Sequence, residues 1–502
     1  MLSEIISYFP QREAMFSFMF FIVLCICLVS IFILYRGHTY LRKIPKPQCN
    51  FILGHIPDFI DRTKILEKLT KYSIECDGLM RIYFPPTKPA ILIANPRDVR
   101  TLLSSGAATK KSKFYDYMKV WLGDGLVTRD EGETWRTRRK LLNPCFGRPS
   151  LLRHYTVQFE ALGDILVEKL SEKLNDTSFD LLPFLKHFSM DVLSKTSLGV
   201  DLNCQKEPHN GYFESVDNMG KIVFERSISP LLKKYDFTFR FTKQYQTQTA
   251  AVDTINNFNR NIMRNKIRSY NSGSEKEPLP TFVDTLIHKM GTEGKVSEKD
   301  VLDEVNTFVF GGHGSTATGL AFTLYALAHH PECQEKILEE QRQIFGHLHN
   351  ELTVTYDHLQ EMKYLEKVIN EALRMYPPFP FIGRKLVKDV ELEGGIVLPK
   401  NLSVGIFVYG LHHNPKYFPE PKKFIPGRFD GNIVPFTFLP FAAGPRTCLG
   451  RKFSMIEMKS TISKLIRNFH LLPPGPTFQL ELVPEMTLTS RNGIKISLEK
   501  RN

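Results

Sequence analysis

One cysteine near the end of the chain lies where a thiolate is favoured. Cys448 stands between Gly444 and Gly450, at the start of a helical pattern, and Arg446 is a nearby cation. Backbone N–H groups at a helix N-terminus and a neighbouring positive charge lower the pKa of a thiol. A thiolate is the form in which cysteine binds a soft metal ion. The loop alone fits either a metal ligand or a buried cysteine in a glycine-rich turn.

A second segment interrupts a helical pattern with glycine. Gly311, Gly312 and Gly314 lie within four residues, and the hydroxyls of Ser315 and Thr316 follow them. Each glycine costs roughly 1 kcal/mol relative to alanine in a helix interior. Three glycines so close together therefore need a reason, and a kinked packing helix is one that requires no chemistry.

The spacing of the cysteine loop resembles the haem-ligand signature of the cytochrome P-450 family. Phe441, Gly444, Arg446, Cys448 and Gly450 occupy all the fixed positions of Phe-x-x-Gly-x-Arg-x-Cys-x-Gly. The resemblance implies haem b as the cofactor, with Cys448 as the ligand of its iron. It extends over nearly the whole chain, and it implies the cytochrome P-450 fold, which is mainly α with small β-sheets (α+β).

The resemblance also implies roles for residues outside the loop. Glu371, Arg374 and Arg428 resemble the family's internal triad, although the glutamate that usually precedes Arg428 is Gly427 here. Arginine suits the binding of haem propionates because it forms bidentate bonds with carboxylates. The expected propionate partners are Trp135, Arg139, Arg384 and Arg446.

In the family, the glycine-rich helix widens locally where oxygen sits over the iron, so Gly312 is expected to lie beside the haem. The usual motif ends acid-Thr-Thr, whereas this chain has Gly314, Ser315 and Thr316. Thr316 keeps a hydroxyl that can hold oxygen. The acid that helps to deliver protons is absent, so the three positions are candidate catalytic residues with an altered relay.

Two neighbouring positions refine this expectation. His313 stands next to the missing acid, and its side chain is expected to point away from the site. Gly311 replaces a glutamate that can form an ester with haem in the fourth P-450 family. Because glycine cannot form this bond, haem is expected to be held without a covalent link to its periphery.

Three classes of function remain open. The first, which Thr316 favours, is a monooxygenase that takes electrons from NADPH through a reductase and inserts one oxygen atom into a lipophilic substrate. The second is a haem-thiolate isomerase, dehydratase or lyase that acts on a peroxide or an aldehyde, and the third is a weakly active haem-binding protein. Segments 371–380 and 411–429 resemble the fourth family, whose members often hydroxylate fatty acids.

The basic character of the chain predicts an acidic partner. The formal net charge is +13, which suits an acidic protein, an anionic membrane or nucleic acid, but no nucleic-acid motif occurs. The expected partners are NADPH-cytochrome P-450 reductase and cytochrome b5, docking mainly through charge. The docking surface is expected to comprise Arg136, Arg138, Arg139, Lys140, Arg451 and Lys452.

The front of the chain predicts a membrane anchor. Residues 14–35 contain no charged residue and match the length of a bilayer core. Basic residues follow this run, so the N-terminal residues 1–13 are expected in the lumen and the C-terminal body in the cytosol. Residues 36–50 form a basic, proline-containing hinge, and residues 51–502 form the haem-binding catalytic domain. The expected location is a single pass through the endoplasmic reticulum membrane.

The elements that position these residues follow from local patterns. Alternating apolar residues predict a strand pair at 79–83 and 90–93. The long glycine-containing helix is expected to start with a capping box, and proline is expected to end it. Helices are expected at 134–142, at 297–330, at 358–376 and after Gly450.

Overall fold

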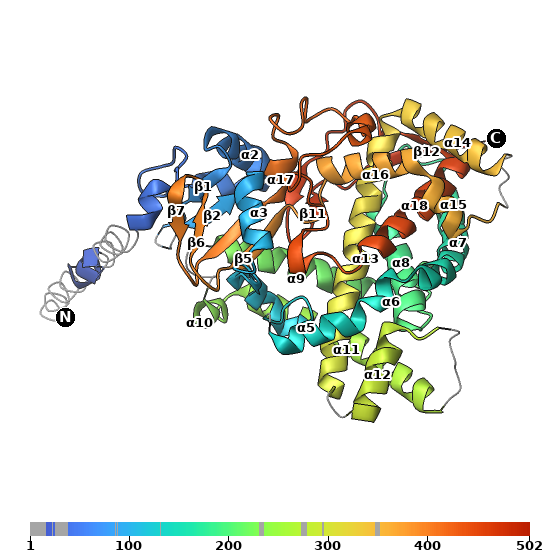
Figure 1. Ribbon diagram of the computed structural model, residues 1–502, viewed down its shortest axis with the longest axis horizontal. Helices are drawn as coiled ribbons and strands as arrows, with labels where there is room; N and C mark the ends of the chain where they lie inside the picture. Colours follow the sequence, from blue (N-terminus) through green and yellow to red (C-terminus); the bar gives the residue numbers. More distant parts are fainter. Residues whose placement is uncertain are drawn as a thin grey trace, which may run out of the picture.

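The computed structural model shows a helical body with its largest sheet toward the N-terminal side and smaller sheets elsewhere (Figure 1). It describes residues 17–22, 24–25, 39–85, 87, 89–130, 132–229, 235–272, 279–293, 296–346 and 352–501. The predicted lumenal segment and most of the predicted anchor lie outside these residues. Within the described ranges, no helix has both the length and the apolar character needed to cross a membrane. The expected mainly α architecture with small sheets is confirmed.

Helices make up most of this body. The longer helices are α2 (Ile65–Glu75), α5 (Glu133–Leu142), α7 (Pro149–Ser171), α8 (Leu182–Leu193), α9 (Asn210–Ile228), α11 (Lys243–Ser272), α12 (Phe282–Glu293), α13 (Glu298–Ala328), α14 (Pro331–Phe345), α16 (Lys363–Met375) and α18 (Arg451–Asn468). The shorter ones are α3 (Pro96–Ser104), α4 (Lys119–Leu122), α6 (Pro144–Gly147), α10 (Asp236–Phe239), α15 (Tyr356–Glu361) and α17 (Val408–His412). The helices predicted at 134–142 and after Gly450 are confirmed as α5 and α18.

The long helix α13 runs through the middle of the molecule (Figure 1). Its 31 residues extend about 46 Å at 1.5 Å per residue. It begins with the predicted capping box, in which Ser297 and Asp300 each accept a hydrogen bond from the other's backbone N–H. Pro331 opens the next helix and ends the run. The predicted long helix and its boundaries are therefore confirmed.

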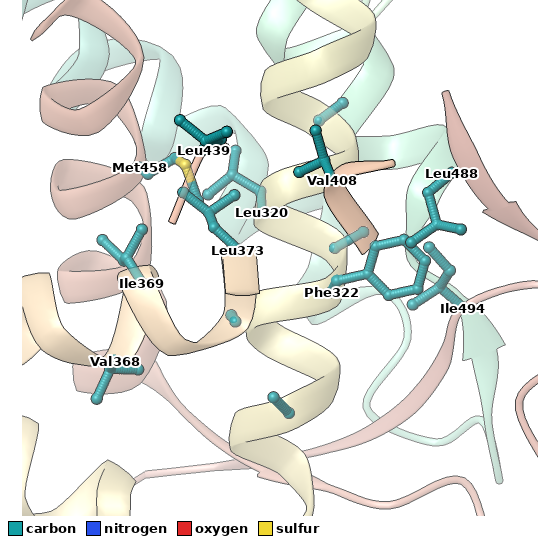
Figure 2. Packing of buried hydrophobic residues seen from close by; sticks show 14 of the residues in the cluster. Leu320, Phe322, Val368, Ile369, Leu373, Val408, Leu439, Met458, Leu488 and Ile494 are labelled. Atoms are coloured by element: carbon teal, nitrogen blue, oxygen red, sulfur yellow. The ribbon is translucent and has the colours of Figure 1, made fainter. Parts of the chain in front are cut away.

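The core packs the C-terminal half of α13 between α16 and α18. Figure 2 shows Leu373 of α16 and Met458 of α18 beside Leu320 of α13, and all three side chains are buried. A Cβ atom on Gly319 would lie 3.3 Å from Met458 Cε and 3.4 Å from Leu373 Cδ2. Glycine here lets the three helices approach closely. Truncation of Leu373 to alanine would cost about 2–5 kcal/mol of stability.

The prediction of a single helix at 358–376 was wrong, because the chain turns at Met362. Two helices, α15 and α16, meet there, and Met362 has the non-helical angles φ −69° and ψ 79°. Leu359, Met362 and Leu365 are all fully buried, so the apolar stripe continues across the turn. Periodicity alone reports which residues are buried and gives no sign that the backbone bends between them.

The largest sheet brings together strands from both ends of the chain. Its order is β1-β2-β8-β5-β3, with β2 and β8 parallel and the other pairs antiparallel. The strands are β1 (Leu79–Ile82), β2 (Ala90–Ile93), β3 (Lys110–Lys111), β5 (Phe381–Lys385) and β8 (Ser403–Phe407). The predicted pair at 79–83 and 90–93 is confirmed. The register of β3 and β5 places Lys111 opposite Arg384.

Smaller sheets complete the fold. The three-stranded sheet has the order β4-β12-β9, and two hairpins pair β6 with β7 and β10 with β11. The strands are β4 (Phe179–Asp180), β6 (Val390–Leu392), β7 (Ile396–Leu398), β9 (Phe469–Leu472), β10 (Leu482–Pro484), β11 (Leu488–Ser490) and β12 (Lys495–Lys500). The turn of the β10–β11 hairpin reaches the cavity described below through Glu485 and Met486.

Candidate active site

A cavity of about 1100 Å³ lies beside α13. Cys448 lines it from the loop that precedes α18, and Gly311, Gly312, Ser315 and Thr316 line it from α13. Further walls come from α5, α9, the large sheet and the β10–β11 turn. The structure thus brings the predicted ligand and most of the predicted oxygen-side residues to one enclosed space. Gly314 is not one of the lining residues.

The cysteine loop is shaped by one required glycine. Gly444 has φ +73°, and a Cβ atom there would lie 2.2 Å from the carbonyl oxygen of Leu103. Past a 3-10 turn at Gly444–Arg446, the Cys448 N–H donates to the carbonyl of Phe441 at 2.9 Å. This bond closes the loop and fixes the thiol at the cavity wall. Gly450 has φ −85° and directly precedes α18.

The expected lowering of the Cys448 pKa was wrong for the protein alone. The thiol opens onto the cavity but is surrounded by protein, and this burial raises its pKa. The Gly450 N–H, Arg139 and Arg451 act in the opposite direction without overcoming burial. A bound metal cation removes the proton from a coordinating thiol outright. The thiolate therefore depends on the metal itself as well as on the loop.

Six cationic side chains line the same cavity, and they are Lys113, Lys400 and a cluster of four whose charges act on one another. Three of the four, Arg139, Arg384 and Arg446, were predicted, and the fourth is Lys111, which faces Arg384 across β3 and β5. Burial, together with the charges of the three arginines, holds the pKa of Lys111 well below its usual value. Among the described residues, no carboxylate pairs with Lys111, Arg139 or Arg384. Such a cluster fits an anion, as the two propionates of haem b would be.

Trp135 and Arg446 are held together at the edge of this cluster. The Arg446 guanidinium lies 3.9 Å from the centre of the Trp135 ring. Both side chains donate to the carbonyl of Leu126, the Trp135 Nε1–H at 3.1 Å and the Arg446 guanidinium at 3.2 Å. Arg446 also donates to the carbonyls of Thr109 and Arg129. Backbone carbonyls therefore set the positions of two predicted propionate partners.

The predicted triad forms in the interior, away from the cavity. Arg374 donates to both carboxylate oxygens of Glu371, at 2.7 and 2.8 Å, and Arg428 Nε donates to the same carboxylate at 3.2 Å. Glu371 and Arg374 are fully buried. The N–H of Ile425 also donates to Glu371, which ties α16 to the segment that carries Arg428. Gly427, where the usual glutamate is missing, does not prevent these contacts.

On the oxygen side, α13 is one uninterrupted α-helix, so the local widening expected there is not present. The Ser315 hydroxyl donates to the carbonyl of Gly311 at 2.7 Å, and the Thr316 hydroxyl donates to that of Gly312 at 3.1 Å. Added Cβ atoms would meet nothing within 4 Å at Gly311 and Gly314. The hydroxyls of Ser315 and Thr316 therefore both border the cavity. The sequence had directed attention mainly to Thr316.

His313 points away from the cavity, as predicted. Its Nδ1–H donates to the carbonyl of Val309, and the centre of its ring lies 5.7 Å from that of Phe213. Burial lowers its pKa to about 4. A neutral imidazole in this apolar setting does not replace the missing acid at position 314.

The predicted docking surface divides into two parts. Arg138 is buried and forms ion pairs with Asp300 and Glu304, both at 3.3 Å, and Arg139 faces the cavity and donates to the carbonyl of Thr447 at 2.8 Å. These two residues were wrongly assigned to the surface, because the helix turns them inward between exposed neighbours. The exposed members of the set are Arg136, Lys140, Arg451 and Lys452.

The fold, the cysteine loop and the cationic cavity together are typical of a haem-thiolate enzyme. The sequence profile of the cytochrome P-450 family matches residues 44–498, and the chain belongs to this family. It is 32% identical to cytochrome P-450 4d2 of Drosophila melanogaster over 480 residues, which cover 91% of this chain and 94% of that protein. It is 30% identical to leukotriene-B4 omega-hydroxylase 3 of Mus musculus over 495 residues, 95% and 93% of the two chains. The chain is therefore a cytochrome P-450 monooxygenase similar to fourth-family members.

Proposed function

We propose that this enzyme inserts one oxygen atom from O2 into a C–H bond of a lipophilic substrate, with electrons from NADPH delivered by a reductase. The observation that carries the proposal is one cavity with Cys448, a cluster of cations and a large apolar wall. Bound there through Cys448, haem b would supply the binding and reductive activation of O2. The cations Lys111, Arg139, Arg384 and Arg446 would hold its propionates.

The apolar wall supports a lipid, hormone or xenobiotic as the substrate. Aromatic side chains from several elements line it, and these are Phe59, Phe84, Phe114, Phe224, Phe308, Phe310, Phe379 and Phe381. Burial of such surface contributes about 25 cal/mol per Å² to binding, so a long hydrocarbon suits the cavity. The name of one relative, leukotriene-B4 omega-hydroxylase 3, supports fatty acids and their derivatives within this class.

Ser315 and Thr316 are the proposed groups for holding oxygen and passing protons. Both hydroxyls border the cavity and donate to carbonyls one turn back, so each can exchange that bond for one to a water molecule. A positioned acid or base contributes typically 10²- to 10⁴-fold to a proton transfer. With glycine at position 314, water held by these hydroxyls would carry the proton.

The test is a single assay of product, NADPH and hydrogen peroxide for wild type, Ser315→Ala and Thr316→Ala. We expect partial coupling in wild type, with some peroxide released, and a lower ratio of product to NADPH in at least one variant. Tight coupling in both variants would show that another relay operates. Gly314, the third candidate, is tested by Gly314→Asp, which should raise the ratio if a carboxylate there can reach the relay.

The missing acid at position 314 favours a second candidate, an isomerase, dehydratase or lyase, which has less need of proton delivery. Rapid conversion of a lipid hydroperoxide without NADPH-driven turnover would identify this function. If neither reaction occurs and haem binds, the protein is a weakly active haem-binding protein.

We propose that the reductase docks on the exposed basic residues near the cysteine loop. Arg136 and Lys140 follow one face of α5, and Arg451 and Lys452 begin α18 directly after the loop. Attraction between an acidic partner and such a surface acts mainly on the association rate and weakens with salt. Haem reduction should therefore slow as ionic strength rises and in the Lys140→Glu variant. Arg138→Gln is the comparison, because it removes a buried positive charge and leaves the surface charge of α5 unchanged. Cytochrome b5 would compete for the same residues.

We propose that the protein is anchored in the endoplasmic reticulum membrane with its catalytic domain in the cytosol. The uncharged run at 14–35 supports the anchor. Apolar side chains exposed on the body, among them Phe51, Ile52, Phe237 and Phe241, support a further contact with lipid. Alkaline carbonate should leave the protein in microsomes, and protease added outside intact microsomes should digest the C-terminal body.

A further inference from the structure

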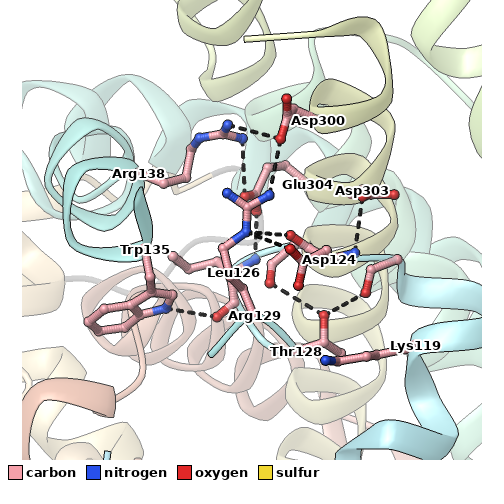
Figure 3. Close-up of polar contacts among 12 residues, drawn as sticks. Lys119, Asp124, Leu126, Thr128, Arg129, Trp135, Arg138, Asp300, Asp303 and Glu304 are labelled. Atoms are coloured by element: carbon pink, nitrogen blue, oxygen red, sulfur yellow. Dashed lines mark hydrogen bonds and ion pairs between the residues drawn. The ribbon is translucent and has the colours of Figure 1, made fainter. Parts of the chain in front are cut away.

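The short loop at residues 123–130, called the 123–130 loop below, lies against α13 and α5 (Figure 3). Its Leu126 and Arg129 carbonyls also accept hydrogen bonds from Arg446 of the cysteine loop. A Cβ atom on Gly125 would lie 2.1 Å from Thr307 Oγ1 and 2.5 Å from the carbonyl oxygen of Asp303. Gly123 has φ +61°, and a Cβ atom there would lie 1.9 Å from Asp303 Oδ1. Two glycines therefore let this loop lie directly on α13.

Carboxylates on one face of α13 hold the loop in place. The N–H of Asp124 donates to Asp303 at 3.0 Å, and the N–H of Leu126 donates to Glu304 at 3.0 Å. Figure 3 shows these bonds together with the ion pair that joins Arg129 to Asp300. Glu304 is only 1% exposed, and within the described chain its cationic partner is Arg138 of α5, at 3.3 Å.

The backbone of Leu126 connects these carboxylates to the cofactor cavity. Its N–H donates to Glu304, and its carbonyl accepts from Trp135 Nε1 at 3.1 Å and from Arg446 at 3.2 Å. Leu126, Trp135 and Arg446 all line the cavity, whereas Glu304 does not. A displacement of the Leu126 backbone would therefore release two predicted propionate partners, Trp135 and Arg446, at the same time.

We propose that Glu304 is a positioning residue for the cofactor, acting through the backbone of Leu126 on Trp135 and Arg446. The proposal rests on the proposed haem site. The N–H and the carbonyl of Leu126 belong to successive peptide units, so hydrogen bonds at both groups hold the backbone on either side of its Cα atom. The position of the carbonyl then fixes the direction of the two donors that bind it. Burial raises the pKa of Glu304 to about 7, while the Leu126 N–H and Arg138 act in the opposite direction. Glutamine at this position keeps the acceptor and removes the charge.

The first experiment compares Glu304→Leu with Glu304→Gln in the purified holoprotein. Haem dissociation is followed by transfer to a haem-scavenging apoprotein, and the propionate bands are recorded by resonance Raman spectroscopy. Loss of a hydrogen bond to a charged group should raise the dissociation rate roughly tenfold in the leucine variant, while the glutamine variant stays within about threefold of wild type. The propionate bands should shift in the leucine variant and remain in the glutamine variant.

A second variant tests the loop without changing a charge, in case Glu304→Leu does not fold. Gly125→Ala should push the 123–130 loop off α13 and accelerate haem loss. Gly132→Ala is the matched control, because a Cβ atom there meets nothing within 4 Å. In a double-mutant cycle, Trp135→Phe should reduce the effect of the Glu304 substitution, since both residues bind the backbone of Leu126.

Two results would overturn the proposal. If the leucine, glutamine and Gly125→Ala variants all lose haem at the wild-type rate, Glu304 does not position the cofactor. Additive effects in the cycle with Trp135→Phe would mean that the influence of Glu304 does not pass through Leu126. If wild type itself does not retain haem, the proposed function fails, and this proposal fails with it. If wild type retains haem and the variants behave like wild type, only the proposed role of Glu304 fails.

Discussion

Two glycine-rich segments border the cavity, the loop at 441–450 and residues 311–316 of α13. In the loop, Gly444 has a left-handed backbone conformation and lies against the carbonyl of Leu103. In residues 311–316 of α13 every glycine has a helical backbone, and of these three only Gly312 has a close neighbour, since its Cβ would lie 2.7 Å from Leu193 Cδ1. Glycine in the loop is required by the backbone, whereas glycine in the helix preserves space.

This difference explains why one segment tolerates variation that the other does not. A loop that must place a thiol and close a hydrogen bond to Phe441 has one acceptable path. A helix keeps the same path with glycine, alanine or an acid at an open position, so position 314 can depart from the family pattern without altering the fold. Departures from a motif are therefore more informative about chemistry in α13 than in the loop.

The largest effect should follow removal of the thiol. Cys448→Ala leaves the loop geometry intact, because the bond to Phe441 uses the backbone N–H, but it removes the proposed metal ligand. We expect the loss of haem or of the long-wavelength absorption of the reduced, CO-bound protein that indicates thiolate ligation. A carbon-monoxide difference spectrum measures this, with Cys145→Ala, a buried cysteine away from the cavity, as the control. An unchanged spectrum for Cys448→Ala would refute the assignment.

Gly444→Ala should have the second largest effect, on stability. An alanine in the left-handed region costs roughly 1–2 kcal/mol, and the overlap with Leu103 adds to this. We expect the free energy of unfolding to fall by at least about 2 kcal/mol, as measured by thermal or denaturant unfolding. Gly450→Ala is the control, because its Cβ would lie 4.0 Å from the nearest neighbouring atom, Cys448 Sγ. Equal losses in the two variants would mean that loop geometry is not the cause.

Local patterns predicted the parts of the site that are local in sequence. The cysteine loop and the capping box of α13 each depend on residues within one short segment. The Glu371–Arg374 spacing alone is equally typical of a surface pair, and its place in the interior was expected only from the resemblance to the family. Lys111 could not be predicted, because it reaches the cavity only through the pairing of β3 with β5. In the sequence Lys111 is one of three lysines within residues 110–113, and nothing distinguishes it from the other two until the register is known.

The burial of Arg138 was missed for a similar reason. The sequence shows a run of basic residues on α5. Only the tertiary structure shows that one of them, Arg138, forms ion pairs with Asp300 and Glu304 of α13. Those two acids are separated from Arg138 by more than 160 residues, so no local rule relates them. Contacts of this range are fixed by tertiary structure and were beyond prediction from one sequence.

A pH-dependent loss of stability should arise in α18, the helix that follows the cysteine loop. Glu457 is buried, accepts a hydrogen bond from the Ser189 hydroxyl at 2.9 Å, and has its pKa raised by burial to about 8 from 4.5. The folded protein therefore holds this proton more tightly than the unfolded chain. The stabilisation is fully present below the unfolded pKa and is lost as the pH rises through the folded one.

The corresponding measurement is the unfolding temperature of wild type and Glu457→Gln between about pH 6 and about pH 9. The glutamine variant should lose less stability than wild type over this range, because it has no proton to release. Glu67→Gln, at an exposed position of α2, is the control and should follow wild type. Parallel curves for all three proteins would contradict the role of Glu457.

The smallest effects should come from the α13 glycines, and here the comparison predicts opposite signs. Gly314→Ala replaces glycine by the best helix former at an open position, so stability should rise by about 1 kcal/mol. Gly312→Ala gains the same propensity but forces Leu193, a buried side chain, to move, and overpacking of this kind costs typically 1–3 kcal/mol. Gly312→Ala should therefore be neutral or destabilising while Gly314→Ala stabilises. Denaturant unfolding of the two variants decides the matter: a stabilising Gly312→Ala would show that Leu193 yields freely, and a destabilising Gly314→Ala would show that position 314 requires glycine for more than space.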